Sequence, residues 1–405
     1  MFLKPFFFIV TLAFSVGVSA EVQFCDTRVW RRAKLVADGQ HVWSFQSSYR
    51  KVRERFSASG DSEALGRRYD RAVTWKQLLD AESLPEAKAD MRAYMRRNSL
   101  SESDVAASSG YQMEREDLGL AVDWAYGLTA RWMIGFQLPM VYRRTRIKSQ
   151  VEMQPALIRG AGQSSQRSAL ALSSEALRER VKALAQDELA NSGYDEIPDQ
   201  KNSFDWGDVS VMSQFALLDH QNWTWSVQQM VRFPTAQNPD VADYFQSGGD
   251  DGQVDLGLTS LLDYRVHRWT LGLRLGYVAQ MPDLIKMRAP EGGVEPDVRR
   301  DLGDWAWAAL DGEYRLDRRW DLSLGYSYLV KDRDRYGTKA FDRVAAESGQ
   351  SLHETRMGVL FELGEYATRS GIDNRWVAAL NYSYPWIGQN STQASRTSLE
   401  LTSYF

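Results

Sequence analysis

The residue types that most often carry enzymatic chemistry are scarce and scattered in this chain of 405 residues. There is one cysteine, Cys25, and there are four histidines, His41, His220, His267 and His353. No histidine has a serine at the spacing of a phospholipase-type site, and a single cysteine supports neither an internal disulfide nor a cysteine-rich metal site. Glu354 and Glu362 lie on one expected strand, too far apart at about 3.3 Å per residue to act on one bond. We therefore expect no catalysis, no metal and no cofactor.

Polar side chains instead recur at alternate positions of short segments, where the intervening residues are apolar. Because alternate residues of a strand face opposite sides, the polar set is expected to line the interior of a barrel. The expected lumen residues are Asp123, Gln137, Arg143, Asp208, Gln214, Gln228, Arg232, Asp255, Asp263, Arg274, Asp321, Glu354, Arg356, Glu362 and Glu400.

Two interpretations of this mixed lumen stay open. In the first, the acids and bases pair with one another in a hydrogen-bonded interior network, because a lone buried charge is costly. Alternatively they form a polar conduction path in which Arg143, Arg232, Arg274 and Arg356 favour anionic or polarised solutes. The formal net charge of −4, with basic residues interspersed among acids, gives no reason to expect nucleic acid as a partner.

Alternating segments recur along the chain and predict about twelve antiparallel strands, an even number as single-chain bacterial barrels require. They lie near residues 42–50, 118–126, 132–142, 209–217, 223–233, 254–264, 269–279, 305–314, 320–330, 355–363, 376–384 and 399–405. Short turns alternate with long polar loops, which places both termini in the periplasm. Tryptophans at or near the strand starts that follow short turns predict a periplasmic aromatic girdle: Trp132, Trp223, Trp269, Trp320 and Trp376.

Two of the expected extracellular loops are unusually long, at about 56–110 and 148–205. The first has Leu78 and Leu79, then Pro85 ahead of Met91, Tyr94 and Met95 at helical spacing. The second has Leu177, Val181 and Leu184 on one helix face, with Gly193 as a C-cap. Such loops form either an external cap or pore constriction, or a partly ordered surface excursion.

Both ends of the chain indicate export to the bacterial outer membrane. Residues 1–20 have the charge, apolar run and small residues of a signal peptide, with cleavage expected before Glu21. The last strand, with Leu399, Leu401, Tyr404 and Phe405, matches the signal that the barrel-assembly machinery reads, and the barrel is expected over 39–405 in outer-membrane lipid. The segment 21–38 is either a small lumen plug or a flexible periplasmic tail; we favour the tail because few apolar residues anchor it.

Several short motifs suggest a family. They are Tyr126-Gly127-Leu128-Thr129, Leu138-Pro139, Gly207-Asp208-Val209, Phe233-Pro234-Thr235 and Val254-Asp255-Leu256-Gly257-Leu258. This set, spanning roughly 118–405, resembles the outer-membrane transporters of the meta-pathway phenol-degradation family and is more distantly similar to barrels that import fatty acids and aromatic hydrocarbons. Ala236, where the family usually has Gly, and the two helical loops depart from the pattern. The resemblance implies passage of small hydrophobic or aromatic compounds.

The sequence thus predicts an all-β, transmembrane, antiparallel up-and-down barrel with helical insertions in two extracellular loops. Its expected function is a passive channel or facilitator for small-molecule solutes. The alternative is a plugged, non-conducting barrel whose external helical loops bind a partner or serve a structural surface role. The number of strands does not decide between them. The interior of a barrel of about eight strands is filled by side chains, a barrel of about sixteen leaves an open channel, and twelve lies between.

Overall fold

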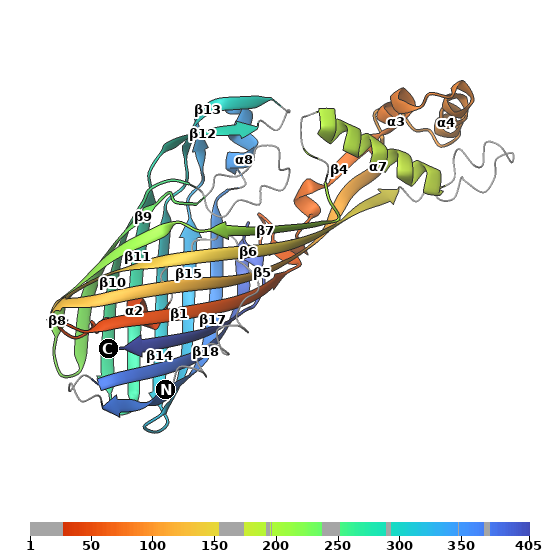
Figure 1. The fold of residues 1–405 in the computed structure, drawn as a ribbon. Coiled ribbons are helices and arrows are strands. Elements are labelled where there is room, and N and C mark those ends of the chain that lie inside the picture. The colour runs from red at the N-terminus through yellow and green to blue at the C-terminus, as the bar shows by residue number, and fades with distance from the viewer. Residues whose placement is uncertain are drawn as a thin grey trace, which may run out of the picture.

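The computed structural model describes residues 27–153, 174–191, 195, 197–236, 252–288, 293–346, 348–367 and 373–405. Within them, twelve antiparallel strands close into a barrel (Figure 1). These are β1 (His41–Val52), β5 (Val105–Thr129), β6 (Trp132–Met153), β8 (Val209–Asp219), β9 (Trp223–Phe233), β10 (Asp255–Val266), β11 (Trp269–Gln280), β14 (Trp305–Arg315), β15 (Trp320–Lys331), β17 (Gln350–Ala367), β18 (Asp373–Gln389) and β20 (Arg396–Tyr404). The last strand pairs with β1, which also pairs with β5. The predicted up-and-down barrel is confirmed.

The strands bury their polar faces and expose their apolar faces. In β8, Val211 and Phe215 are each 47% exposed, whereas Gln214 between them in register is fully buried. A water-soluble β-sandwich buries its apolar faces and exposes its polar ones. Exposed apolar faces and buried polar faces are instead typical of a membrane barrel, whose outer band faces lipid and whose lumen is polar. The alternation of polar and apolar residues that predicts the strands therefore also fixes which face of each strand points into the barrel.

Tryptophans gather where short turns join the strands. Trp132, Trp223, Trp269 and Trp320 each begin a strand and are exposed outside the barrel, while Trp376 near the start of β18 is half-buried. Three of these rings lie over aromatic partners on the neighbouring strand: Trp223 over Tyr264, Trp269 over Tyr314 and Trp320 over Phe361, with centroids 4.3 to 4.7 Å apart. This ring of indoles forms one girdle of the barrel.

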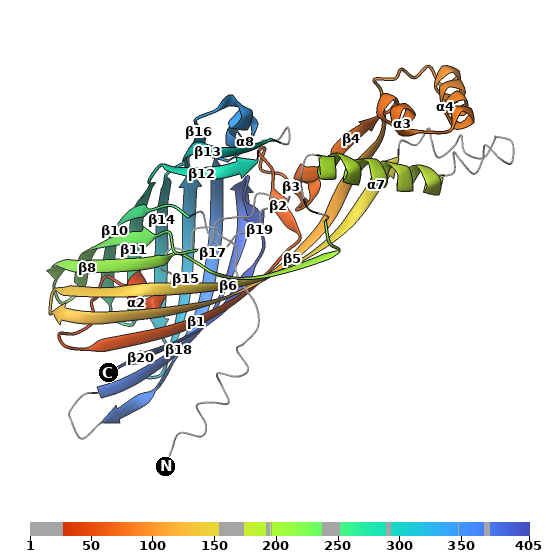
Figure 2. The same ribbon diagram turned by 45° about the horizontal axis from the view of Figure 1, so that its top comes forward.

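A helical head extends from the opposite end of the barrel on the long β5–β6 hairpin (Figure 2). It consists of β4 (Arg71–Thr74), α3 (Trp75–Ala81), α4 (Pro85–Arg97) and α7 (Ser174–Asn191), packed around Trp75, Leu78, Met91 and Val181. Thr74 and Gln77 form a capping box at α3, and Pro85 opens α4. The predicted helices in the two long loops are confirmed; the predicted cap Gly193 lies outside the described residues.

The loop boundaries differ from those expected, because β5 begins at Val105 and β6 runs to Met153. Their pairing continues past the apolar band as far as Ala107 opposite Met153. Shorter elements cover the same end of the barrel: β2 (Glu54–Phe56), β3 (Ser62–Ala64), η1 (Arg67–Tyr69), β7 (Gln200–Trp206), β12 (Asp283–Arg288), β13 (Val294–Asp301), β16 (Arg335–Tyr336), η2 (Lys339–Phe341), α8 (Asp342–Ala346) and β19 (Thr392–Gln393). None of the described helices combines the length and apolarity needed to cross a membrane.

The N-terminal residues 27–38, which we call the insert, lie inside the barrel and include the short helix α2 (Arg28–Arg31) (Figure 1). Asp38 forms a parallel bridge with Gly127, and the Gly39 amide donates to the Gly127 carbonyl at 2.9 Å. The expected flexible tail is therefore wrong for these residues. The few apolar side chains of the insert do suffice to anchor it, because they pack on buried methionines of the wall and its arginines meet lumen carboxylates.

Candidate functional site: the barrel lumen

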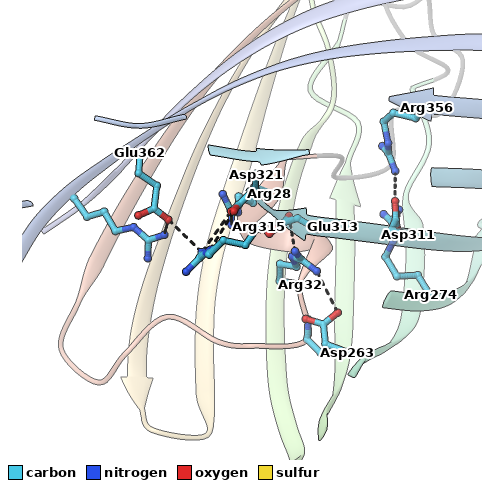
Figure 3. Close-up of polar contacts among 12 residues, drawn as sticks. Arg28, Arg32, Asp263, Arg274, Asp311, Glu313, Arg315, Asp321, Arg356 and Glu362 are labelled. Atoms are coloured by element: carbon cyan, nitrogen blue, oxygen red, sulfur yellow. Dashed lines mark hydrogen bonds and ion pairs between the residues drawn. The ribbon is translucent and has the colours of Figure 1, made fainter. Parts of the chain in front are cut away.

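Ion pairs hold the insert against the barrel wall (Figure 3). The Arg32 guanidinium lies 2.5 Å from the Glu313 carboxylate and 3.7 Å from that of Asp263. Arg28 contacts Glu313 at 3.3 Å, and its backbone N–H donates to Glu400 at 2.9 Å. The carboxylates come from β10, β14 and β20, so the insert connects strands on several sides of the lumen.

Backbone and apolar contacts complete this seat. Gln214 of β8 donates from Nε2 to the Arg32 carbonyl at 2.8 Å. The Trp30 ring is buried, and it passes close to Gly135 of β6, where an added Cβ would lie 2.6 Å from the indole. The Trp124 carbonyl would be closer still, at 2.0 Å. Glycine at position 135 therefore leaves the room that the Trp30 ring needs.

A second polar cluster lies on the wall beyond the insert. Asp311 of β14 accepts from Arg274 of β11 at 2.5 and 2.9 Å and from Arg356 of β17 at 3.0 Å (Figure 3). The Arg274 guanidinium also lies over the Trp307 ring, 5.7 Å from its centroid. One carboxylate thus serves two guanidiniums, and one of these is stacked on an indole.

A third cluster surrounds Asp117 of β5. Its carboxylate lies 3.0 Å from Arg50, 3.0 Å from Arg115 and 3.6 Å from Arg143. The Asp117 side chain is almost fully buried. Three guanidiniums around a single buried acid leave this part of the lumen wall positively charged.

Near the short turns, acids and bases form a connected series of ion pairs. Arg315 pairs with Asp321 at 3.0 Å and with Glu362 at 3.5 Å, and Glu362 also accepts from Arg375. The charges at this end form a chain of alternating sign.

The expected lumen residues lie where strand alternation places them, on the inner face. Twelve of the fifteen are buried: Asp123, Gln137, Arg143, Asp208, Gln214, Gln228, Arg232, Asp255, Asp263, Arg274, Asp321 and Glu400. Glu354, Arg356 and Glu362 are half-buried. Gln137 donates to Asp123 and Arg232 pairs with Asp255, each at 2.9 Å. Asp208 instead accepts from the Ala236 amide at 2.8 Å, close to a loop. Glu354 and Glu362 belong to separate parts of the lumen.

Sequence reasoning missed Asp311, Glu313 and the insert residues Arg28, Trp30 and Arg32. Asp311 and Glu313 lie at the same alternate positions of their strand as Trp305 and Trp307. Strand alternation therefore places all four on one face. On the last strand, Leu399 and Phe405 are exposed and Leu401 is half-buried, while Tyr404 turns inward and borders the lumen.

The two larger cavities found among the described lumen residues lie on either side of the insert. The outer cavity, of about 190 Å³, has Trp30 at its border and is lined by Trp305, Trp307, Leu329, Leu352, Arg274 and Arg356 among others. The inner cavity, of about 620 Å³, is bordered by Arg28, Arg32, Val36, Asp263 and Glu313. The insert thus separates a compartment toward the long loops from one toward the short turns. Within the described chain no group of three or more His, Cys, Asp or Glu side chains is placed to hold a metal ion.

Comparisons with known proteins agree with this architecture. No protein-family model and no curated protein matches the chain. Among solved structures, an outer membrane channel from Pseudomonas putida F1 matches at TM-score 0.53 and 12% identity, covering 95% of this chain and 100% of that one. The TodX ΔS2S3 mutant, a monoaromatic hydrocarbon channel, gives 0.39 at 10% identity, covering 97% of each chain. A Pseudomonas aeruginosa FadL homologue gives 0.34 at 7%, covering 92% and 91%.

The first match shows that the fold is that of a bacterial outer-membrane β-barrel. The two weaker matches add no argument, and the phenol-degradation family name stays a prediction.

Proposed function

We propose that the protein is an outer-membrane channel through which small hydrophobic or aromatic molecules pass passively. The observation that carries this proposal is the outer cavity, where three indoles, Trp30, Trp305 and Trp307, face one space inside the barrel. Its volume of about 190 Å³ is comparable to the apolar cavity of about 150 Å³ that is known to take up benzene. A single aromatic ring therefore fits.

The route follows from the two cavities. A solute enters from the long loops, rests against the indoles and then meets the insert, beyond which the inner cavity leads toward the short turns. Passage therefore needs a displacement of the insert, and the Trp30 side chain borders the outer compartment at that point. The name of the matched Pseudomonas putida protein, an outer membrane channel, supports this role by analogy of fold.

The surroundings of the channel are part of the proposal. We take the chain to be exported with its signal peptide, residues 1–20, removed, and inserted in outer-membrane lipid by the assembly machinery that reads Leu399, Leu401, Tyr404 and Phe405. It acts without a cofactor and without catalysis. The lumen residues set which solutes enter, and no step of this function requires a chemical reaction.

A second candidate function has a specific observation in its favour. The insert is held by several ion pairs, and the helical head has its own apolar core around Trp75, Met91 and Val181. A barrel that stays closed, with its head as a surface structure or partner-binding element, fits both observations. Conduction distinguishes the two functions, because a closed barrel carries no current.

The test is single-channel conductance of the purified, refolded chain in a planar bilayer, comparing Trp30→Ala with Trp132→Ala. Both variants remove one indole, but the Trp132 ring lies outside the barrel and donates to Ser213 at 2.8 Å. We expect steady current in the parent, a severalfold larger current in Trp30→Ala and an unchanged one in Trp132→Ala. Absence of current in all three proteins supports the closed, partner-binding barrel instead.

A further inference from the structure

We infer that the solutes held in the outer cavity are aromatic anions, with the ring against the indoles and the carboxylate against arginine. This inference rests on the proposed function and names its substrate class. It goes beyond the passage of neutral hydrocarbons, because the cavity wall offers basic side chains as well as an apolar surface.

The lining of the outer cavity has more basic than acidic side chains. Four arginines border the outer cavity, Arg50, Arg274, Arg356 and Arg396, against two carboxylates, Asp117 and Glu354. The difference is two positive charges. The ion pairs of Asp117 and Arg274 add Arg115, Arg143 and Asp311. Within this set, six guanidiniums meet three carboxylates.

Several of these arginines share one carboxylate. Two of the acids are shared: Asp117 lies near three guanidiniums, and Asp311 lies near Arg274 and Arg356. Each arginine keeps a partner, yet the sum of the field stays positive. In a narrow space with low-dielectric walls, such a field concentrates anions. The inner cavity is also bordered by more basic than acidic side chains, seven against Asp263 and Glu313, so the grouping of Trp30, Trp305 and Trp307, and not charge alone, distinguishes the outer cavity.

An arginine and an indole lie side by side in the wall of the outer cavity. The Arg274 guanidinium stacks on Trp307. Arg356 reaches the same Asp311 from β17, which is separated from β14 by one strand (Figure 3). The fork of Arg274 already donates from Nε and Nη2 to Asp311, so a planar aryl carboxylate would compete with Asp311 for the same guanidinium. The indoles of Trp305 and Trp307 line the same space and offer apolar faces for a ring. An aryl carboxylate satisfies both features at once.

The experiment compares three probes on the purified full chain by isothermal titration: benzoate, benzyl alcohol and acetate. Benzyl alcohol keeps the ring without the charge, and acetate keeps the charge without the ring. We expect benzoate to bind about tenfold more tightly than either, as a charge-assisted contact adds to ring burial. Equal binding of benzyl alcohol and benzoate overturns the inference while leaving a channel for neutral aromatics intact.

Variants locate the contact. Arg356→Gln is expected to weaken benzoate about tenfold and to leave benzyl alcohol unchanged. Asp311→Asn removes the competing carboxylate and is expected to tighten benzoate. Arg315→Gln, which borders the inner cavity, is the matched control and should leave both probes unchanged. If Arg356→Gln weakens both aromatic probes equally, the effect is structural and the inference fails.

Conductance separates this failure from failure of the proposed function. Steady current without benzoate preference keeps the channel and rejects the anion. Absence of both current and binding of any probe rejects the proposed function itself. Because the comparison of the three probes on the parent chain needs no substitution, the inference stays testable even if a variant does not fold.

Discussion

Gly276 of β11 lies opposite Trp307 of β14, and a methyl group added at Gly276 would lie 2.2 Å from the indole ring. The neighbours that this methyl would meet are ring atoms of the tryptophan and not backbone. The indole can therefore reach its place over Arg274, at the wall of the outer cavity, only because residue 276 has no side chain.

Substituting Gly276 by alanine should displace the Trp307 ring while the barrel still forms. We expect a loss of stability of about 1–3 kcal/mol, as for other overpacked sites, together with weaker benzoate binding in titration. Gly312→Ala is the matched control, because its added methyl meets only ordinary contacts at 3.8 Å and beyond. Equal losses in the two variants would mean that strand glycines matter for a reason other than the Trp307 position.

Arg32 should govern how firmly the insert stays in place. Arg32→Gln leaves Asp263 and Glu313 with one cationic partner fewer, and breaking such buried pairs typically costs about 3–5 kcal/mol. We expect longer or more frequent open events in single-channel recordings. Lys34→Gln removes the same charge from an exposed side chain of the insert and should change little. A comparable rise in both variants would point to net charge and not to anchoring.

Tyr336 offers a test by pH in the loops outside the barrel. Burial, with a further contribution from nearby Asp334, raises the pKa of Tyr336 to about 12. The neutral phenol stabilises the folded loop sheet of β12, β13 and β16 below the ordinary tyrosine pKa. That contribution is lost as the pH rises through the folded-state value. The absorbance difference at alkaline pH between the parent and Tyr336→Phe should titrate near pH 12; a midpoint near 10 would contradict this burial.

Phe405 should matter for assembly more than for stability. Its backbone exchanges hydrogen bonds with His41 at 2.9 and 3.1 Å, and its exposed ring meets Trp376 edge to face. We expect Phe405→Ala to reduce the amount of barrel in the outer membrane of cells while refolding in detergent stays efficient. Leu380→Ala, which trims an apolar side chain that is 53% exposed on the next strand, is the control. Equal depletion of both variants in cells would remove the special role of the terminal residue.

The sequence predicts the strands well where one face meets lipid and the other the lumen. Phe215 and Gln214 differ in polarity because their surroundings differ, so the alternation is visible locally. Beyond the apolar band that constraint ends, since both faces of β5 and β6 near Ala107 and Met153 lie outside it. The extension of this hairpin was therefore not predicted, although the helices that it carries were, from their own spacing and from Pro85.

For the insert, the sequence offers a lumen plug only as the less favoured alternative, and for another reason. Its partners Asp263, Glu313 and Glu400 lie on three strands far along the chain, and no local pattern around Arg28 or Arg32 indicates them. Asp263 and Glu400 are predicted only as ordinary lumen residues, and Glu313 is not predicted. Only the closed barrel brings the basic N-terminal insert next to acids from later strands. The separation of the lumen into two cavities depends on this contact.

The hydrogen bond from the Arg28 amide to Glu400 has a consequence for how the molecule is built. The two residues are 372 positions apart, and Glu400 also accepts from Ser44 at 3.0 Å across the pair of strands that closes the barrel. The first described residues therefore find one of their partners only when the last strand arrives. Filling the lumen and sealing the wall become one event of high contact order, in which the beginning and the end of the chain are joined at the same carboxylate.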